Sequence, residues 1–191
     1  MNSISDFSIV NATKDDAPLI AKAVAMALDI DIEAPGDPRA EWCRKVFGTL
    51  AARDDAQYSY LNTLKAVTSD GTPVGFLVNY DGAQLHQLRE AFFEVVRNQT
   101  GEDMRGISDE TDPDEWYLDS LAVWPEYRNL GIGHALMEAG IARAHKAGKP
   151  AGLLVDKNNP RARRMYEKLG FEKVGDRPFA RTMMDHMRTP A

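Results

Sequence analysis

The stretch LAVWPEYRNLGIGHALM, residues 121–137, decides which fold the sequence predicts. An apolar strand ends at Val123, a short loop carries Gly131 and Gly133 at alternate positions, and a helical periodicity begins at once. Glycines in such a loop allow unusual backbone torsions and let a ligand approach the backbone. The free N–H groups of the loop and first helical turn converge, backed by the positive end of the helix dipole. We predict an anion site suited to a pyrophosphate; a turn that binds nothing is the alternative.

Two other nucleotide-binding motifs also place glycines between a strand and a helix. A dinucleotide fingerprint needs a third glycine three places on, but that position holds Leu136. A P-loop needs Gly-Lys-Ser/Thr, but Gly133 is followed by His134. The sequence therefore excludes both motifs.

Short apolar runs and helical periodicities extend outward from this stretch. Strands are expected at 7–10, 64–67, 74–78, 116–123 and 153–156, with two more between 171 and 187. Helices are expected after the capping pair Thr13 and Asp16, around the apolar set Cys43, Val46, Phe47 and Leu50, from Leu85 to near Gly101, from Ile132 to Gly148, and from the cap Asn159 to Gly170. Strands pair through a hairpin in the first half and alternate with helices in the second. This order predicts an α/β fold, a three-layer sandwich with a mixed sheet and helices on both faces.

Composition fits one globular domain spanning residues 1–191. The chain has 29 acids against 23 bases, a formal net charge of −6, and 43% apolar residues. The single Cys43 excludes an internal disulfide framework. No signal peptide or membrane span is apparent, so a cytoplasmic location is expected. The acidic balance argues against a general affinity for nucleic acid.

The negative charge is concentrated in one segment. Residues 102–115 hold seven acids and one base, and the rest of the chain is formally neutral. The segment has no apolar periodicity, which predicts a surface loop. With the helix before it, it forms a helix-plus-acidic-loop insertion at about 84–115.

Two motifs resemble a known family. The loop 128–133 matches the R/Q-x-x-G-x-G/A signature of the GNAT superfamily of N-acetyltransferases, and the strand before it resembles the family's as well. A second match follows the family's N-x-x-A-x-x-x-Y-x-x-x-G-F spacing, on Asn159, Ala162, Tyr166, Gly170 and Phe171. The resemblance is close over residues 116–174 and covers the whole chain in element order. It implies a GNAT-like sandwich with a mostly antiparallel central sheet.

The resemblance also implies which residues meet acetyl-CoA, the family's acetyl donor. Loop amides bind its pyrophosphate, which here falls on Arg128, Asn129, Leu130, Gly131, Ile132, Gly133 and His134. The backbone of the preceding strand pairs with the pantetheine arm, which implies Leu121, Ala122 and Val123. Asn159 would bond the cofactor's arm, and Tyr166 would protonate the leaving thiolate as a general acid. A tyrosine that only fills the core is the alternative for Tyr166.

The base that takes a proton from the attacking amine is less defined. Side chains alternate along a strand, which places Glu115, Tyr117, Asp119 and Leu121 on one face. Asp119 lies about 7 Å along the strand from Leu121, so it could hold an ammonium or relay a proton through water. Glu115, roughly 20 Å from Leu121, is expected to be a loop charge. A water chain as the base, or Asp119 as a satisfied polar residue, stays open.

No metal is expected. The four histidines show no pair at metal-ligand spacing, and Cys43 lies on the apolar face of a helix. A basic helix face could contact the 3′-phosphate of CoA or could simply be solvated; it consists of Arg161, Arg163, Arg164 and Lys168.

The acceptor is sought beside the acidic insertion. We expect its carboxylates to border the acceptor site and to attract a cationic amine; an acidic loop without a role is the alternative. The expected reaction is direct transfer of an acetyl group from acetyl-CoA to a primary amine of a small cationic molecule. A protein or peptide N-acetyltransferase and a non-catalytic acyl-CoA-binding module are the competing hypotheses. Neither nucleic acid nor a membrane is an expected partner, and a homodimer stays open.

Overall fold

The computed structural model describes residues 6–179 and 182–190. The strands of that part are β1 Phe7–Asn11, β2 Thr63–Thr68, β3 Pro73–Asp81, β4 Trp116–Val123, β5 Ala151–Asp156, β6 Glu172–Phe179 and β7 Thr182–Arg188. The helices are α1 Ala17–Ala27, α2 Pro38–Ala51, α3 Leu85–Thr100, α4 Ile132–Lys146 and α5 Pro160–Lys168. Each predicted strand and helix is present. None of the described helices is both long enough and apolar enough to cross a bilayer.

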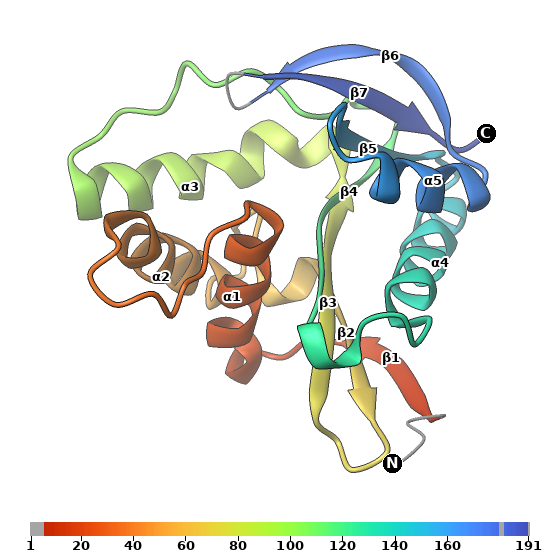
Figure 1. The fold of residues 1–191 in the computed structure, drawn as a ribbon. Coiled ribbons are helices and arrows are strands. Elements are labelled where there is room, and N and C mark those ends of the chain that lie inside the picture. The colour runs from red at the N-terminus through yellow and green to blue at the C-terminus, as the bar shows by residue number, and fades with distance from the viewer. Residues whose placement is uncertain (1–5, 180–181, 191) are drawn as a thin grey trace.

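The strands form one open sheet in the order β1-β2-β3-β4-β5-β7-β6. Every neighbouring pair is antiparallel except β4 and β5, which run parallel. The predicted mixed, mostly antiparallel sheet is confirmed. The parallel pair lies in the middle of the sheet (Figure 1), with β3, β2 and β1 beyond β4 and with β7 and β6 beyond β5.

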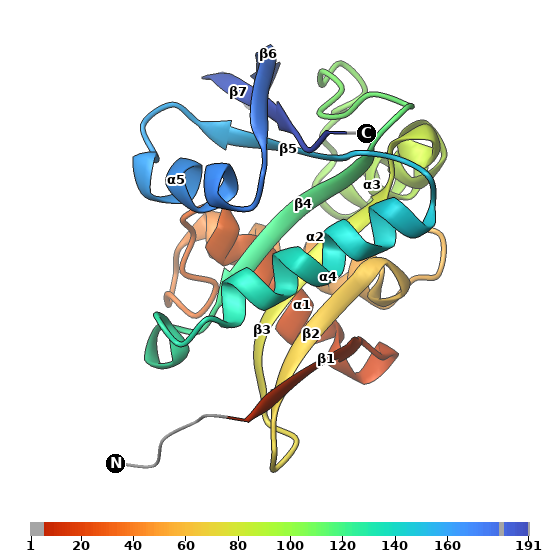
Figure 2. The same cartoon turned by 90° about the vertical axis from the view of Figure 1, so that its right-hand side faces the viewer.

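Helices cover both faces of the sheet, as predicted. In Figure 1, α1, α2 and α3 lie on one side of the strands, and α4 and α5 lie on the other. Figure 2 looks onto the second side, where α4 crosses in front of β2, β3 and β4. The layers therefore sandwich the sheet, and β4 is buried between α1 and α4.

The contact of α4 with the sheet depends on a small residue. A Cβ built on Gly140 would lie 2.8 Å from Leu77 Cδ2 and 2.9 Å from Leu118 Cδ2, closer than real Cβ contacts. Only glycine lets the helix approach β3 and β4 this closely. The close approach fixes the helix whose N-terminus carries the predicted anion site.

The helix α3 is packed into the core and is not an appendage. Its predicted apolar positions Leu85, Leu88, Phe92, Val95 and Val96 are all buried. Phe92 meets Trp42 of α2, with ring centroids 6.5 Å apart. The helix ends at Gly101, whose φ of 76° is the left-handed conformation of a glycine stop. The predicted insertion at about 84–115 thus begins with a helix whose apolar face belongs to the hydrophobic core of the protein.

The predicted capping pair is confirmed, with one addition. The backbone N–H of Thr13 donates to Asp16 Oδ2 at 2.7 Å. Lys65 of β2 also donates to both Asp16 oxygens, at 2.9 and 2.7 Å. Burial opposes the charge of Asp16, but these hydrogen bonds outweigh it and leave its pKa lowered. The start of the first helical segment is therefore tied to the sheet.

The acidic segment differs from its prediction. It has neither helix nor strand, as expected, but Glu110, Thr111 and Glu115 are buried. A Cβ built on Gly82 would lie 2.2 Å from the carbonyl oxygen of Asp112, so the segment packs directly on the end of β3. Composition alone marks acids as exposed, but these acids are buried because basic partners from other elements neutralise them.

Candidate active site

The predicted anion site lies at the N-terminus of α4. Asn129 and Gly131 have φ values of 63° and 82°, and these left-handed residues turn the chain from the end of β4 into the helix. Among the described residues no side chain caps α4, and a Cβ built on Gly131 would meet nothing within 4 Å. The N–H groups of the first turn therefore face open space at the positive end of the helix dipole.

Two guanidinium groups border this loop. Arg128 Nε donates to the carbonyl of Val123 at 3.1 Å, and Arg161 Nη2 donates to Asn129 Oδ1 at 2.7 Å. Arg163, which the sequence placed on the same basic face, instead pairs with the buried Asp185 at 2.5 Å. Arg161 is thus the member of that face held at the loop, where an anion would be favoured.

The parallel strands β4 and β5 separate soon after they start. Their register covers only Trp116 with Ala151 and Tyr117 with Gly152. Beyond this point the strands diverge, and residues 119–123 and 154–156 line a cavity. The edge of β4 that faces β5 therefore presents backbone N–H and C=O groups to the cavity. No pattern in the sequence predicts this separation.

The cavity joins the predicted residues into one site. Its volume is about 780 Å³, and it runs from the loop at the start of α4 to the end of α1 and the β6–β7 hairpin. Its lining contains Asp119, Leu121, Ala122, Val123, Arg128, Asn129, Gly131, Ile132, Gly133, His134, Asn159 and Tyr166. Leu130, the remaining predicted residue, is exposed in the loop outside that lining. Clefts of this size suit a small-molecule ligand.

Tyr166 contributes a phenol to the cavity wall. Its ring lies 6.0 Å from that of Phe171, and its hydroxyl forms no hydrogen bond with another described side chain. Burial raises the pKa of Tyr166 to about 12, so the phenol stays protonated at neutral pH. Asn159 caps α5 by accepting from the N–H of Ala162 at 3.1 Å, and its carboxamide NH₂ remains available to the cavity.

Asp119 lies at a β-bulge, which corrects the predicted face of β4. Val78 pairs with Ser120 and Asn79 pairs with Leu118, so Asp119 has no partner on β3. The Leu118 side chain points to α4, since it lies against Gly140 of that helix. The Leu121 side chain points to α4 as well, since a Cβ built on Gly133 would lie 4.0 Å from Leu121 Cδ2. The extra residue reverses the alternation. Asp119 and Leu121 therefore lie on opposite faces, and the prediction that they share one face is wrong.

A network of buried polar groups holds Asp119. Gln57 Nε2 and the Tyr80 hydroxyl lie 3.0 and 3.2 Å from Asp119 Oδ2. The same two groups lie 2.5 and 3.0 Å from Glu110 Oε1. Arg89, whose side chain is only 3% exposed, contacts the other oxygen of Glu110 and also Asp109 Oδ1, the latter at 2.8 Å.

The environment makes Asp119 a better proton acceptor than an ordinary aspartate. Burial raises its pKa, and the hydrogen bonds from Ser120, Gln57 and Tyr80 offset only part of that rise. Burial and the charge of Asp119 together raise the pKa of the surrounding phenols well above 10, those of Tyr58, Tyr80 and Tyr117. The phenols thus stay neutral around the Asp119 carboxylate.

The sequence profile of the acetyltransferase (GNAT) family matches residues 26–171. The chain belongs to this family. The expected resemblance and fold are thereby confirmed, and membership of this family supports an acetyltransferase; acetyl-CoA is the donor typical of GNAT proteins.

Individual relatives agree with this assignment. A solved structure described as an acetyltransferase is 30% identical, with a TM-score of 0.78, covering 95% of this chain and 98% of its own. An N-acetyltransferase from Staphylococcus aureus Mu50 is 22% identical with the same TM-score, covering 95% and 100%, and supports the fold. The mycothiol acetyltransferase of Nocardiopsis dassonvillei is 39% identical over 74 residues. That match covers 38% of this GNAT chain and 22% of the relative's length.

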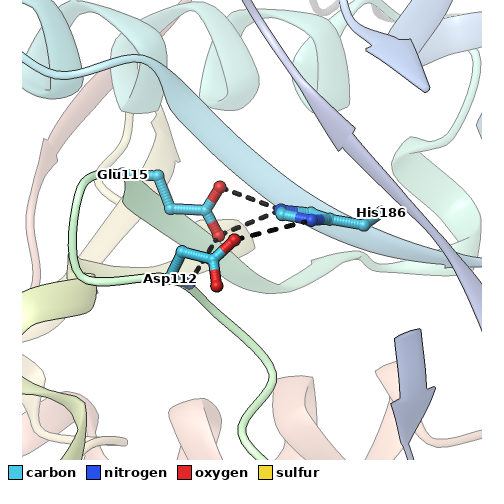
Figure 3. Close-up of side chains that lie close together, drawn as sticks. All are labelled: Asp112, Glu115 and His186. Atoms are coloured by element: carbon cyan, nitrogen blue, oxygen red, sulfur yellow. Dashed lines mark hydrogen bonds and ion pairs between the residues drawn. The ribbon is translucent and has the colours of Figure 1, made fainter. Parts of the chain in front are cut away.

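This GNAT protein contains a second acidic cluster, outside the cavity, that could suggest a metal site. Asp112, Glu115 and His186 place their ligand atoms within 4.8 Å of one another (Figure 3). Glu115 accepts from His186 Nε2 at 2.9 Å and pairs with Arg188 at 3.3 Å, while Asp112 pairs with Arg177 at 2.7 Å. The arginines already supply the positive charge that a cation would bring. The expectation of no metal stays a prediction.

Glu115 is therefore not the loop charge that the sequence predicted. Its side chain is fully buried, and a Cβ on Gly152 would lie 2.2 Å from Glu115 Oε2. The carboxylate ties the end of the acidic segment to β5 through Gly152 and to β7 through His186 and Arg188, and Thr111 Oγ1 of the same segment also donates to it at 2.7 Å.

Four residues that shape the GNAT site were missed by sequence reasoning: Gln57, Tyr58, Tyr80 and Arg89. Glu110 belongs to the acidic segment whose carboxylates were expected to border the acceptor site, and it lines the cavity. One of the four missed residues carried a usable signal. Arg89 falls at i+4 from Leu85 and three residues before Phe92, on the apolar stripe of its helix. An arginine in such a position is buried only with acidic partners, which the segment 102–115 supplies.

Proposed function

We propose that the protein transfers the acetyl group of acetyl-CoA directly to a primary amine of a small cationic molecule. One observation carries the proposal: a single cavity links the uncapped N-terminus of α4 with a carboxylate, Asp119, and passes the phenol of Tyr166. An anion site, a proton donor and a proton acceptor are what this transfer requires along one path.

The residues around the loop fit acetyl-CoA. The open space beside Gly131, the free N–H groups of α4, and Arg128 and Arg161 would hold its pyrophosphate and phosphates. The exposed backbone of β4 at 121–123 and the free amide of Asn159 would hold the pantetheine arm. When bound, acetyl-CoA supplies an activated acyl group whose leaving group is a thiolate.

Two side chains would manage the protons. Asp119 would bind the acceptor's ammonium and accept its proton, directly or through water, because burial has raised its pKa. Tyr166 would give its proton to the departing sulfur, because its phenol is neutral and has no described partner that competes for the proton. The two roles need no metal ion.

The acceptor end of the cavity favours a cation. Glu110 and Asp119 lie there beside the rings of Tyr58 and Tyr117, and Phe179 lines the same cavity. Carboxylates and aromatic faces both stabilise an ammonium in a partly desolvated cavity. Side chains from the acidic segment, β4 and the hairpin surround this end, which supports a small acceptor over a protein surface.

A turnover screen tests the proposal. CoA release from acetyl-CoA would be measured with polyamines, amino acids, aminoglycosides and short peptides, and products would be identified by mass spectrometry. We expect N-acetylated products from small cationic amines. Turnover confined to peptides would favour the protein or peptide N-acetyltransferase. Calorimetric binding of acetyl-CoA without turnover on any acceptor would favour a non-catalytic acyl-CoA-binding module.

A further inference from the structure

Two acidic side chains meet at the acceptor end of the cavity, and the mechanism proposed above uses only one of them. Glu110 comes from the acidic segment, is 2% exposed and lines the cavity beside Asp119. Its Oε1 and Asp119 Oδ2 lie in hydrogen-bonding range of the same two groups, Gln57 Nε2 and the Tyr80 hydroxyl. The carboxylates are therefore neighbours that share their donors.

The shared donors couple the two carboxylates. Gln57 Nε2 has two hydrogens but three acceptors in range: Tyr80 Oη at 3.0 Å, Glu110 Oε1 at 2.5 Å and Asp119 Oδ2 at 3.0 Å. Tyr80 has one hydroxyl hydrogen and two carboxylates to give it to. A hydrogen bond made to Glu110 is thus withheld from Asp119, so a change of charge on one alters the solvation of the other.

The two carboxylates have unequal cationic partners. Glu110 pairs with Arg89, which is buried and is held from its other side by Asp109. Within the described part of the chain, no lysine or arginine forms an ion pair with Asp119. The charged and titratable groups that face Asp119 are Glu110 from the acidic segment, Arg89 from α3, Tyr58, Tyr80 from β3 and Tyr117 from β4. Among the described residues, Glu110 thus has a direct cationic partner and the neighbouring Asp119 has none.

We propose that Glu110 is a positioning residue for Asp119: it occupies Arg89 and shares its two donors with Asp119, which makes Asp119 the carboxylate that takes up the proton. This inference rests on the proposed function in treating Asp119 as the proton acceptor. The positive charge of Arg89 favours the ionised form of Asp119, and the Glu110 carboxylate, which pairs with Arg89, offsets that effect. The acidic segment thereby acts on the proton acceptor from inside the cavity.

The coupling can be measured without any acceptor. The carboxyl carbon of Asp119 would be titrated by ¹³C NMR in the free enzyme, using Asp119→Asn to assign the signal. In Glu110→Gln the titration midpoint should fall by about one pH unit, since the opposing charge is removed. Asp109→Asn is the matched control, because Asp109 also contacts Arg89 but touches neither Gln57 nor Tyr80. It should leave the midpoint almost unchanged.

A second variant separates coupling from loss of structure. Tyr80→Phe removes a donor to Asp119, so the midpoint should rise instead of falling. Shifts of opposite sign cannot come from a general loosening of the fold. An Asp119 midpoint that does not move in Glu110→Gln, or that moves equally in Asp109→Asn, would overturn the proposal.

Kinetics link the coupling to turnover. The acidic limb of the kcat/KM profile, measured with the amine acetylated fastest in the screen, should move to lower pH in Glu110→Gln, with a lower plateau because a weaker base remains. The amine is the same in every assay, so its own titration is common to all variants. An Asp119 midpoint that shifts while the limb stays fixed would leave the Glu110 coupling intact and refute Asp119 as the proton acceptor.

Discussion

Removal of one oxygen atom, in Tyr166→Phe, tests the proposed proton donor. The Tyr166 hydroxyl faces the cavity, has no described hydrogen-bond partner, and has a pKa raised to about 12 by burial. The substitution keeps the ring and its contact with Phe171. It therefore removes a proton donor and leaves the packing intact.

The expected loss can be estimated from the role of the group. A positioned general acid contributes about 10²- to 10⁴-fold to the rate, or about 2.7–5.5 kcal/mol of transition-state stabilisation. We expect kcat to fall by that factor, with acetyl-CoA affinity within about twofold of wild type. The free energy of unfolding should change by less than about 1 kcal/mol, because no hydrogen bond within the protein is lost. Steady-state kinetics, calorimetry and urea denaturation measure the three quantities.

The pKa adds a constraint on the wild-type enzyme. With a pKa of about 12, Tyr166 stays protonated through the range of an ordinary assay, so it should produce no alkaline loss of kcat there. Tyr60→Phe is the control, because that hydroxyl bonds Asp54 outside the cavity, at 2.9 Å. A Tyr166→Phe enzyme with wild-type kcat, or one that loses acetyl-CoA binding and kcat together, would refute the general-acid role.

Three further predictions follow from single residues. Gly131→Glu should weaken acetyl-CoA binding, measured by calorimetry, at least tenfold, because it adds a negative charge at the anion site and strains a φ of 82°. Asparagine tolerates that torsion and carries no charge, so Gly131→Asn should bind acetyl-CoA better than the glutamate variant. Asp119→Asn should lower kcat/KM and yet raise the melting temperature at neutral pH. A carboxyl group whose folded-state pKa is raised destabilises the protein as pH rises through that pKa. The gain in melting temperature should therefore vanish at acidic pH, and an equal gain at all pH values would contradict the reasoning. Glu115→Gln should lower the free energy of unfolding in urea by about 3 kcal/mol, since it leaves His186 and Arg188 without their buried partner, whereas Asp114→Asn, on the exposed side of Arg188, should cost less than about 1 kcal/mol.

The elements were predictable because their signals are local. The capping pair at Thr13 and Asp16, the cap at Asn159 and the stop at Gly101 each act within a few residues, and each lies where its helix begins or ends. The two family signatures marked residues that line the cavity for the same reason. They describe a loop and a helix start that the chain builds from consecutive residues.

The acceptor end was not predictable because its geometry depends on distant pairings. Strict alternation placed Asp119 with Leu121, but the bulge arises from the register of β4 on β3. The opening between β4 and β5 likewise depends on how few residues the two strands pair. Gln57, Tyr80 and Glu110 meet Asp119 only after the loop that follows α2, β3 and the acidic segment have packed together, so no spacing along the chain marks them.

Ion pairing changes what the charge of −6 means for the acceptor. The segment 102–115 accounts for that charge, and from composition it was expected to attract a cation over a distance. Five of its seven acids pair with basic groups of other elements: Asp109, Glu110, Asp112, Asp114 and Glu115. Paired charges largely cancel at long range, whereas a carboxylate inside a cavity acts at contact distance and is little screened by salt. A preference for a cationic acceptor should therefore originate from Asp119 and its neighbour Glu110, and the KM for such an amine should depend far more on these two side chains than on ionic strength.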